Sequence, residues 1–599
     1  MLHMVFTICT EKSEVFGYRV AIGLSLASVV LQLGCASNQQ EQVRSPMTFP
    51  TKEALLALGP ARPIETIGQD NVVRVEGHRL TGPFPMTLSL QPYEDPSPLG
   101  VAIEQRVSRG RGKVSTSVAL HCAARELGSF VLEHGALPAP GLQRFVFARC
   151  GSLVASPRLL SWGHPVPATD DTWMQAGARA MDEKLDALVA GERVSVGAWA
   201  GRNEDHAFMI AVAGERSVSL APVRIAPDAN NRIILQGTVQ VPADNVAASI
   251  NLGTYGVGRC WTDPGVHLPN FAVHCTMAPT DSSAWVQLVA ERRENLLSET
   301  VLRVLVQRND QGEMDYRAPH DVPSRPVHDA AGFRTALIDQ VNVVRGRAGV
   351  RPLRLLDAQS ALADKVSPHF FVGREGEDLR TTQDQVAFGL LAGWDVGGTI
   401  RGGDFLAVAS PTVDAGHWLA DMLEQPMARE TLLSAEAEGL AAGVVVQPET
   451  PVLASLVTTY SFFEGFDHTA EATKILQRLQ SYRAWYRQPP ATPLVLPNFS
   501  AICHEVTGGR MSVRDAMDRL LHAASMHWNR PTAAHVVETV APDAVQFAPD
   551  LLRYTPPWVG IGVCHRKAPD APWGHYVLFF VYTPVNAPGQ YALNELGND

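Results

Sequence analysis

Apolar and polar positions along this chain of 599 residues follow helical and strand periods in turn. From Thr335 to Val344 apolar residues recur at helical spacing, and Gly349 behind a basic turn predicts the end of that helix. A second amphipathic run, 414–423, predicts another helix, whereas the apolar segments 443–446 and 453–460 predict strands. Helices that alternate with short strands predict a three-layer α-β-α sandwich in this part of the chain.

The region 69–222 mixes the same two patterns and predicts an α+β domain. Residues 72–92 alternate between apolar and polar positions, which is typical of half-buried strands. Three helices are expected next, followed by a pair of strands. The expected helices are 118–134, 141–150 and 172–189, and the expected strands are 194–199 and 207–212.

Residues 223–310 carry short apolar runs at nearly regular spacing, separated by Pro, Gly, Asn and Asp. This pattern predicts a β-sandwich. The stretch 309–326 is rich in Pro, Asp and His, so we expect a linker there. The expected strands are 233–241, 247–252, 271–275, 285–289 and 302–306.

Segments of the C-terminal half resemble a known family. The run from Leu337 to Leu353 is similar to LLxxVNxxRxxAGxxPL, the first helix of CAP domains (the cysteine-rich secretory, antigen 5 and pathogenesis-related-1, or SCP-like, superfamily). The run from Gln425 to Leu433 resembles the pattern SPGHRxNLL of bacterial members, and 443–445 resembles the strand after it. The resemblance implies a CAP-like domain over 330–465.

After Glu464 the chain shows a similar order again. The amphipathic run 473–483 stands where a second first helix is expected, and Val559–Val563 reads as the family's VGVGV strand. We therefore expect a second, divergent CAP-like unit over 466–599. The alternative is one enlarged domain whose last strands come from the end of the chain. The fold class predicted overall is α+β multidomain.

The resemblance also implies a cavity, which in intact members holds two histidines and two acidic residues able to bind zinc. Here one histidine position is Ala428, which can neither bind a metal nor move a proton. The remaining candidates are His369, Asp404 and His417. Two histidines and one aspartate suit zinc, but His369 between Pro368 and two phenylalanines also reads as a packed core histidine, and His417 as a solvated side chain.

A weaker cluster lies in the last region. His504 precedes Glu505, and His535 and Glu538 are three residues apart on an expected helix. No HExxH zinc motif results, because Gly508 stands in the second histidine's place. Since no GxSxG elbow, P-loop or dinucleotide fingerprint stands out, the sequence favours a binding protein over an enzyme, with no cofactor beyond the zinc alternative.

The N-terminus predicts export. A basic flank and a short apolar run over 20–33 read as a signal peptide ending at residue 35. The residues Leu33-Gly34-Cys35-Ala36 resemble a bacterial lipobox, which implies acylation of Cys35 and an anchor in the outer membrane or at the cell surface. An ordinary cleaved signal and an uncleaved anchor are the alternatives. The polar segment 36–68 predicts a tether.

Six further cysteines fall two to a region, which predicts disulfides in an oxidising compartment. No CxxC pair or zinc-finger spacing competes with this reading. The expected pairs are Cys122 with Cys150, Cys260 with Cys275, and Cys503 with Cys564.

Composition narrows the classes of partner. The chain is 46% hydrophobic and 19% charged with a net charge of −11, as in folded globular proteins. The basic cluster Arg106–Lys113 is expected in a solvated loop, and the acidic balance disfavours nucleic acid. The function favoured is a binding scaffold in the cell envelope for a lipid, a glycan or another protein. The alternatives are a divergent metal-dependent hydrolase and a structural spacer.

Overall fold

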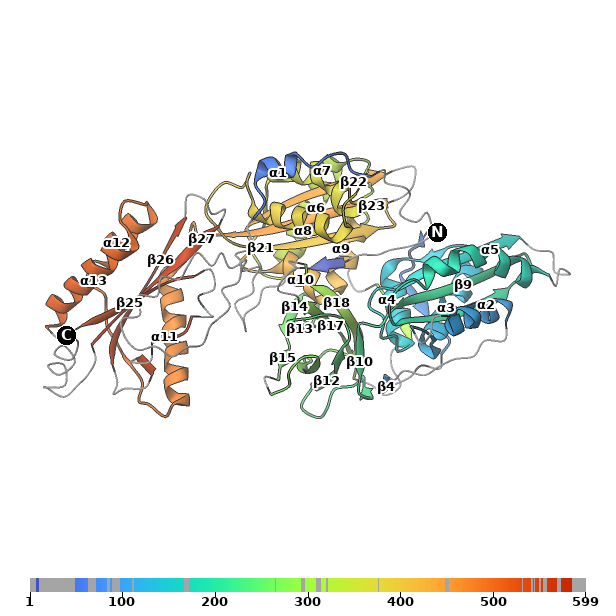
Figure 1. The fold of residues 1–599 in the computed structure, drawn as a ribbon, viewed down its shortest axis with the longest axis horizontal. Helices are drawn as coiled ribbons and strands as arrows, with labels where there is room; N and C mark the ends of the chain where they lie inside the picture. The colour runs from blue at the N-terminus through green and yellow to red at the C-terminus, as the bar shows by residue number, and fades with distance from the viewer. Residues whose placement is uncertain are drawn as a thin grey trace. The chain divides into compact units, whose positions relative to one another are not determined.

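The computed structural model describes the chain in two compact units, each taken by itself below (Figure 1). The first contains residues 51–391 and 405–459 together with the N-terminal ten, and the second contains residues 392–404 and 460–599 together with residues 11–50. The described residues are 7–9, 49–62, 72–82, 84, 87–88, 97–109, 113–165, 172–263, 265–291, 297–308, 314–318, 322–374, 376–447, 452–529, 532–539, 542, 545–548, 551–552, 557–567 and 573–583. The expected signal peptide, apart from 7–9, and the lipid site Cys35 lie outside them.

The first layered region of unit 1 is built on a sheet with the strand order β5-β8-β9-β7. Successive residues of β9 point to opposite faces: Met209 joins the buried cluster of Leu185 on α5, and Ile210 joins that of Phe130 on α3. Helices therefore cover both faces. The elements are α2 (Pro98–Arg109), β5 (Val114–Thr116), α3 (Val118–His134), α4 (Pro140–Arg149), β7 (Arg158–Pro165), α5 (Trp173–Leu188), β8 (Val194–Arg202) and β9 (His206–Glu215).

Two four-stranded sheets follow, ordered β10-β12-β16-β15 and β14-β13-β17-β18. Ile233 of one sheet and Leu288 of the other belong to one buried cluster, so the two sheets enclose a core as the alternating pattern predicted. The strands are β10 (Val218–Leu220), β12 (Arg232–Val239), β13 (Asn245–Leu252), β14 (Gly256–Arg259), β15 (Trp261–Thr262), β16 (Asn270–Thr276), β17 (Ser283–Glu291) and β18 (Glu299–Gln307).

The second layered region has the sheet order β1-β21-β23-β22-β20. On one face Leu406 packs in the cluster of Trp418, and on the other the rings of Phe405 and Phe370 lie 5.5 Å apart. The elements are β1 (Thr7–Cys9), α6 (Ala330–Arg347), β20 (Arg354–Leu355), α7 (Asp357–Val372), α8 (Leu379–Ala392), β21 (Ile400–Ser410), α9 (Ala415–Glu424), α10 (Pro426–Leu433), β22 (Gly439–Gln447) and β23 (Val452–Phe462).

Parts of the segments expected to be a tether and a linker are folded onto unit 1. Within the expected tether, α1 (Lys52–Leu56) buries Leu55 beside Gly389. Within the expected linker, β19 (Asp315–Arg317) pairs with β3 (Gly77–Arg79). Other short pairs are β2 (Val72–Val73) with β6 (Leu137–Pro138), and β4 (Thr87–Leu88) with β11 (Val223–Arg224).

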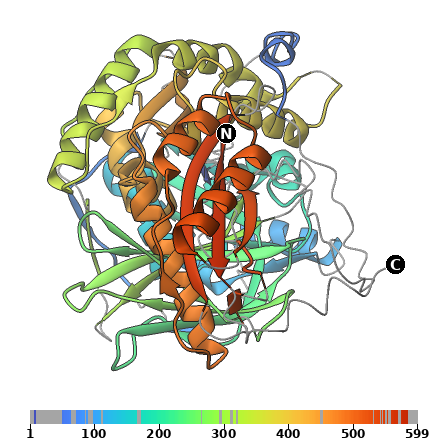
Figure 2. The ribbon, with the colours of Figure 1, turned by 90° about the vertical axis from the view of Figure 1, so that its left-hand side faces the viewer.

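Unit 2 is again layered, with the sheet order β24-β26-β27-β25. Leu578 of β27 faces the cluster of Ile475 on α11, and Phe579 faces that of Leu520 on α13. Figure 2 looks at this unit, with its helices over the red strands. The elements are α11 (His468–Trp485), β24 (Thr492–Pro493), α12 (Phe499–Thr507), α13 (Val513–Trp528), β25 (Ala533–Thr539), β26 (Trp558–Lys567) and β27 (Gly574–Thr583).

One secondary-structure prediction in unit 2 is wrong. His535 and Glu538 lie on the strand β25 and not on a helix, where they pair with Phe580 and Val577 of β27. Residues an odd number apart on a strand point to opposite faces, so these two side chains do not share one. The apolar pair Val536 and Val537 is compatible with both a helical and a strand period. Pairing with β27 stabilises the strand.

The three layered regions share most of their order of elements. In each, a helix precedes a short strand, two helices follow, and three longer strands complete the sheet; α5 in the first region and α9 and α10 in the second are inserted between the first and second of these strands. The sheet orders β5-β8-β9-β7, β20-β22-β23-β21 and β24-β26-β27-β25 are the same, and in each the short first strand runs parallel to its neighbour. The described part of the chain therefore contains three α-β-α regions with the same order of four sheet strands, and a β-sandwich lies between the first two in sequence.

Equivalent polar side chains close the first helix of the second and third regions. Asn342 accepts from the amide of Leu353 and donates to its carbonyl, and Gln480 forms the same two bonds with Ala491. In both cases the partner lies 11 residues further on. Three residues after each of these side chains is a fully buried arginine, Arg345 or Arg483. The Asn and Arg of the CAP-like pattern are therefore structural groups in this chain.

Three disulfides join the pairs predicted from the cysteine spacing, Cys122–Cys150, Cys260–Cys275 and Cys503–Cys564. Such bonds persist in oxidising compartments, so they support an exported protein. Within the described residues, no helix has the length and apolar content needed to cross a membrane.

Candidate functional site

A pocket opens in unit 1 where α4 faces the sandwich strands β17 and β18. The space between its walls, counted together with open solvent at its mouth, is about 700 Å³. Its walls combine apolar surfaces with a few polar groups, the usual composition of a small-molecule site. The apolar walls include Phe147, Leu159 and Trp285, and the polar lining groups are Gln143, Arg144, Ser152, Ser156, Arg303 and Gln425.

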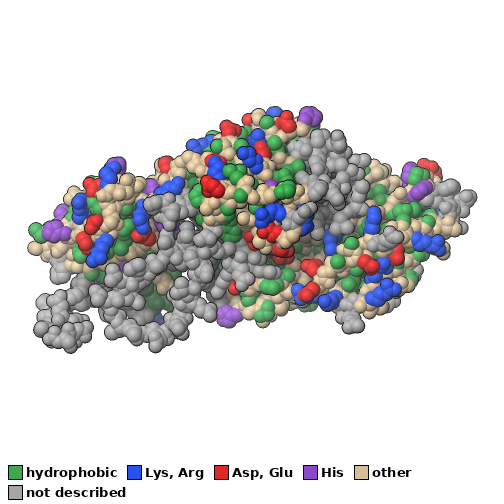
Figure 3. Space-filling view, turned by 45° about the horizontal axis from the view of Figure 1, so that its top comes forward, with side chains coloured by type: hydrophobic (Ala, Val, Ile, Leu, Met, Phe, Trp, Pro, Cys, Tyr) green, Lys and Arg blue, Asp and Glu red, His purple; other side chains and the backbone are tan. Residues whose placement is uncertain are grey.

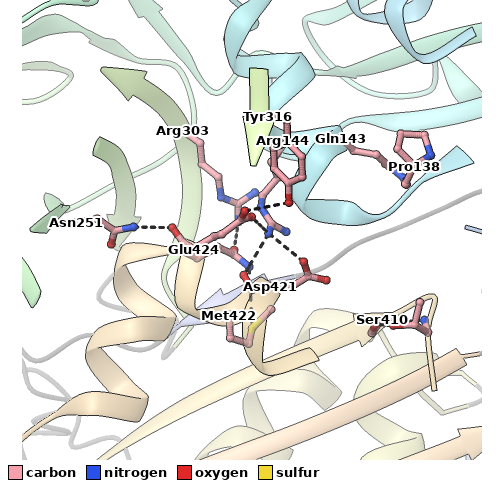
Figure 4. A network of polar contacts seen from close by, with 12 residues as sticks. Pro138, Gln143, Arg144, Asn251, Arg303, Tyr316, Ser410, Asp421, Met422 and Glu424 are labelled. Atoms are coloured by element: carbon pink, nitrogen blue, oxygen red, sulfur yellow. Dashed lines mark hydrogen bonds and ion pairs between the residues drawn. The ribbon is translucent and has the colours of Figure 1, made fainter. Parts of the chain in front are cut away.

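Arg144 anchors the pocket to a buried ionic network (Figure 4). Its Nη2 donates to the carboxylate of Glu424 and lies 3.4 Å from the Oδ1 atom of Asp421. The hydroxyl of Tyr316 donates to the other Glu424 oxygen at 3.3 Å. The side chains of Arg144, Asp421 and Glu424 are 13%, 10% and 5% exposed, so the charges interact largely out of water.

The network shifts the proton affinities of its members. Burial by itself would lower the pKa of Arg144, but Glu424 and Asp421 raise it, which keeps the guanidinium charged. Burial raises the pKa of Asp421 to about 6, with Arg144 opposing the shift and Glu424 adding to it. Burial, followed by the two carboxylates, also raises the pKa of Tyr316. Tyr316 is therefore a neutral hydrogen-bond donor at physiological pH.

Arg303 carries the second positive charge in the pocket wall. It extends from β18, donates through Nη1 to the Ala155 carbonyl at 2.8 Å, and through Nη2 to Oε1 of Gln425 at 3.1 Å. Gln425 is itself 2% exposed, so it fixes the guanidinium in place. A planar, oriented guanidinium that lines the same pocket as Trp285 suits a carboxylate, sulfonate or phosphate that carries an apolar group.

The backbone at the end of α9 is fixed by the sandwich. Asn251 donates to the Glu424 carbonyl at 2.7 Å, and Gly141 of α4 approaches so closely that an added Cβ would overlap the Tyr316 hydroxyl. The pocket and its network are therefore formed where three segments distant in sequence meet: α4, the sandwich and α9.

Ala428, the position that the family resemblance assigns to a cavity histidine, lies on α10 and is fully buried in the hydrophobic core. Its neighbour Arg429 donates to the carbonyls of Leu423, Gly253 and Gly256, and Glu430 pairs with Arg259 at 3.0 Å. The motif that resembles the family's histidine helix therefore attaches α10 to the sandwich.

The three candidate ligands from the sequence occupy separate elements: His369 on α7, Asp404 on β21 and His417 on α9. The Nε2 atom of His369 lies 2.6 Å from the Gly59 carbonyl, and the residue is 9% exposed. His417 lies beside Asp414, its helix N-cap, and burial lowers its pKa. The described residues contain one group of three close metal-ligand side chains, and none of the three candidates belongs to it.

The basic cluster at Arg106 is only partly a loop. Arg106 lies on α2, is 8% exposed, and pairs with Asp182 and Asp186 of α5 at 2.9 and 2.8 Å. Its charge is therefore neutralised inside the fold. Acidic and basic side chains intermingle on the described part of the face in Figure 3.

Unit 2 holds a pair of stacked histidines that the sequence did not single out. The Nε2 atom of His468 and the Nδ1 atom of His565 are 2.8 Å apart. The ring of Phe463 stacks on that of His565, with their centroids 4.4 Å apart. Burial lowers the pKa of His565 to about 4, with His468 lowering it further and Glu464 opposing. A hydrogen bond between two ring nitrogens needs one of them unprotonated, so the two rings cannot both be imidazolium while this bond is formed.

No family model matches the chain, and no curated protein matches it. Among solved structures it is similar to a cysteine-rich secretory protein from Staphylococcus aureus subsp. aureus Mu50, with 12% identity, a TM-score of 0.17, and coverage of 40% of this chain and 82% of that one. It is also similar to an extracellular SCP-domain protein from Bacillus anthracis str. Ames, with 11% identity, a TM-score of 0.17, and coverage of 41% and 88%. At these values the likeness is weak and does not assign the chain to a family.

Proposed function

We propose that the chain is an exported binding protein of the cell envelope and that the pocket beside Arg144 and Arg303 is its ligand site. The observation that carries the proposal is the combination of an apolar wall, formed by Phe147 and Trp285, with the oriented guanidinium of Arg303. An apolar pocket with a few convergent polar groups is the usual form of a small-molecule site.

The chemistry of the wall favours an amphiphilic anion, such as a lipid-like carboxylate or phosphate. Arg144 is neutralised by Glu424 and Asp421. Arg303 is oriented by its bonds to the Ala155 carbonyl and to Oε1 of Gln425 and lines the pocket, so its guanidinium is the group that we expect a ligand anion to meet. The aromatic ring of Trp285 would cover the ligand's apolar part.

The residues at the expected cavity positions also support a binding role. Its histidine position is the buried Ala428, and the ring of His369 is engaged by a backbone carbonyl. The hydrolase alternative through His369, Asp404 and His417 therefore has less support than binding. The identity of the layered regions as CAP-like domains and lipidation of Cys35 belong to the proposal, with the sequence patterns and the repeated element order as their support.

Titration with 8-anilinonaphthalene-1-sulfonate, an apolar ring system with a sulfonate, tests the proposal. We expect saturable binding to one site and a loss of affinity of at least about tenfold, or about 1.4 kcal/mol, in Arg303→Gln and in Trp285→Leu. Trp261→Leu is the matched control, because Trp261 is 52% exposed and lies on β15, outside the pocket lining.

Far-ultraviolet circular dichroism should first confirm that each variant is folded, so that a loss of probe binding can be distinguished from unfolding. Equal probe binding by wild type, Arg303→Gln and Trp285→Leu would show that the pocket is not the site. Weaker binding in Trp261→Leu alone would move the site to the exposed sandwich strand.

A further inference from the structure

Two histidines and a glutamate converge at one end of the first layered region, away from the residues that line the pocket. His78 lies on β3, and Glu133 and His134 are the last two residues of α3. One ligand atom from each of the three side chains lies within 4.8 Å of the others. Neither the sequence spacing nor the family pattern pointed to them, because 55 positions separate His78 from Glu133 in the sequence.

The local fold explains how neighbours in sequence face the same point. The helix α3 ends at Gly135, which adopts a left-handed conformation with φ 75°, so the chain turns immediately after His134. The Nε2 atom of His134 lies 3.7 Å from Oε1 of Glu133. Two ligands bound to one tetrahedral zinc ion at 2.0–2.1 Å would be about 3.4 Å apart, so the observed separation needs little adjustment.

An apolar floor positions both imidazoles. Phe130, one turn earlier on α3 and 2% exposed, contacts His134 with ring centroids 4.2 Å apart and His78 edge-on at 5.0 Å. The two imidazole centroids are 6.0 Å apart. Rings held against a buried phenylalanine lose little further freedom when they bind an ion.

The His134 nitrogen nearest Glu133 forms no hydrogen bond with the described residues. The Nε2 atom of His134 is shielded from solvent and has no hydrogen bond within the described part of the chain. A shielded polar atom without a partner is costly, and a metal ion would satisfy it. The nearby carboxylate of Glu126 is already engaged by Thr81 and Arg125, so it is not available as a further ligand.

We propose that His78, Glu133 and His134 form a binding site for a divalent transition metal ion, zinc in the first place. Two imidazoles and one carboxylate are ligands that zinc prefers, and three protein ligands leave a fourth position for water or an exogenous group. The site is distinct from the cavity positions His369, Asp404 and His417, and from the pocket proposed to bind an amphiphilic anion.

Isothermal titration with zinc chloride at pH 7.5 tests the site, using the full chain purified without a polyhistidine tag. One ion should bind per chain, and His78→Ala, His134→Ala and Glu133→Gln should each weaken binding at least about tenfold, since loss of even outer-sphere partners of a metal ligand has that effect. His206→Ala, which removes an exposed histidine of β9, should bind like wild type. Substituted cobalt should show the visible absorption of a four- or five-coordinate ion, and Glu133→Gln should alter that spectrum.

Three results would overturn the proposal: no zinc binding by the wild-type chain, equal binding by the three ligand variants, or a loss confined to His369→Ala. The last would place the ion in the family's cavity instead. Glu133→Gln is nearly isosteric at an exposed position, so its result does not depend on tolerance of an alanine at His78 or His134. Failure of the anionic probe to bind would leave this test unaffected.

Discussion

The guanidinium of Arg144 on α4 donates to the carboxylate of Glu424 at the end of α9, across 280 residues of sequence. Asp421, one turn earlier on α9, completes the ion network, and Tyr316 satisfies the remaining Glu424 oxygen. Because these groups are buried and mutually compensating, the network ties the first layered region to the second and holds one wall of the pocket in place.

Removal of the Arg144 charge should destabilise unit 1. Arg144→Met leaves two buried carboxylates without their cation, and breaking a buried pair in this way costs about 3–5 kcal/mol. The expected result is a lower denaturant midpoint and a lower melting temperature. Arg232→Met is the matched control, because its pair with Asp228 at 3.1 Å is 55% and 41% exposed and should contribute at most about 1 kcal/mol. Equal effects would mean that the network does not act as a buried ion cluster.

Acidification should weaken unit 2 through its histidine pair. The pKa of His565 is lowered to about 4 in the folded chain, mainly by burial, while the unfolded chain binds a proton near pH 6.5. The stability from keeping this ring neutral is therefore fully present above pH 6.5 and declines as the pH falls from 6.5 towards 4.

His565→Gln should remove part of that slope, by about 1–2 kcal/mol once solvent screening of this partly exposed ring is allowed for. Thermal unfolding between pH 7.5 and 4.5 measures it. The exposed-site variant His206→Gln should keep the wild-type dependence, and an unchanged slope in His565→Gln would contradict the assignment.

Arg345 and Arg483 should respond alike to substitution. Each is fully buried on the first helix of its layered region and donates through Nε to a carbonyl six residues further on and through Nη1 to a distant leucine carbonyl. Lysine is a point donor and cannot span both groups, so Arg345→Lys and Arg483→Lys should each cost about 2–4 kcal/mol of unfolding free energy. Arg351→Lys, at a side chain 50% exposed, is the control. Tolerance of lysine at one position only would show that the two are not equivalent.

The sandwich should depend on its disulfide. Cys260 and Cys275 close a loop with a sequence separation of 15, for which the chain-entropy model gives about 3 kcal/mol. The double variant Cys260→Ser, Cys275→Ser should therefore unfold at lower denaturant concentration than wild type. A reducing agent should lower the denaturant midpoint of the wild-type protein, and it should lower the midpoint of the variant by a smaller amount. Insensitivity of the wild-type protein to reduction would contradict a disulfide-stabilised, exported fold.

Sequence periodicity could predict the helices and strands of the layered regions and of the sandwich, because these elements carry local signals. Gly135 ends α3 where a helix stop was expected, and Ser512 caps α13 through its hydroxyl. The cysteine pairing was also accessible, since each pair lies within one region.

The candidate sites could not be predicted from the sequence in the same way. Arg144, Trp285 and Arg303 come from separate elements, and no spacing in sequence links them. Arg106 read as part of a basic loop because its two aspartate partners lie 76 and 80 residues further on. His78 and His134 meet only because β3 pairs with β19 and α3 stops at Gly135. In each case tertiary contacts supply what local pattern lacks.

The central claim is that the pocket recognises an apolar group together with an anion, and calorimetric titration with decanoate and with decanol tests it most directly. The two ligands share a chain length and differ in the carboxylate. We expect the wild-type chain to bind decanoate at least about tenfold more tightly than decanol, and Arg303→Gln to lose that preference while still binding decanol, since one charge-assisted hydrogen bond to a guanidinium contributes about 1.5–3 kcal/mol. Equal affinity of the wild-type chain for both ligands, or a preference for decanoate that survives Arg303→Gln, would contradict it.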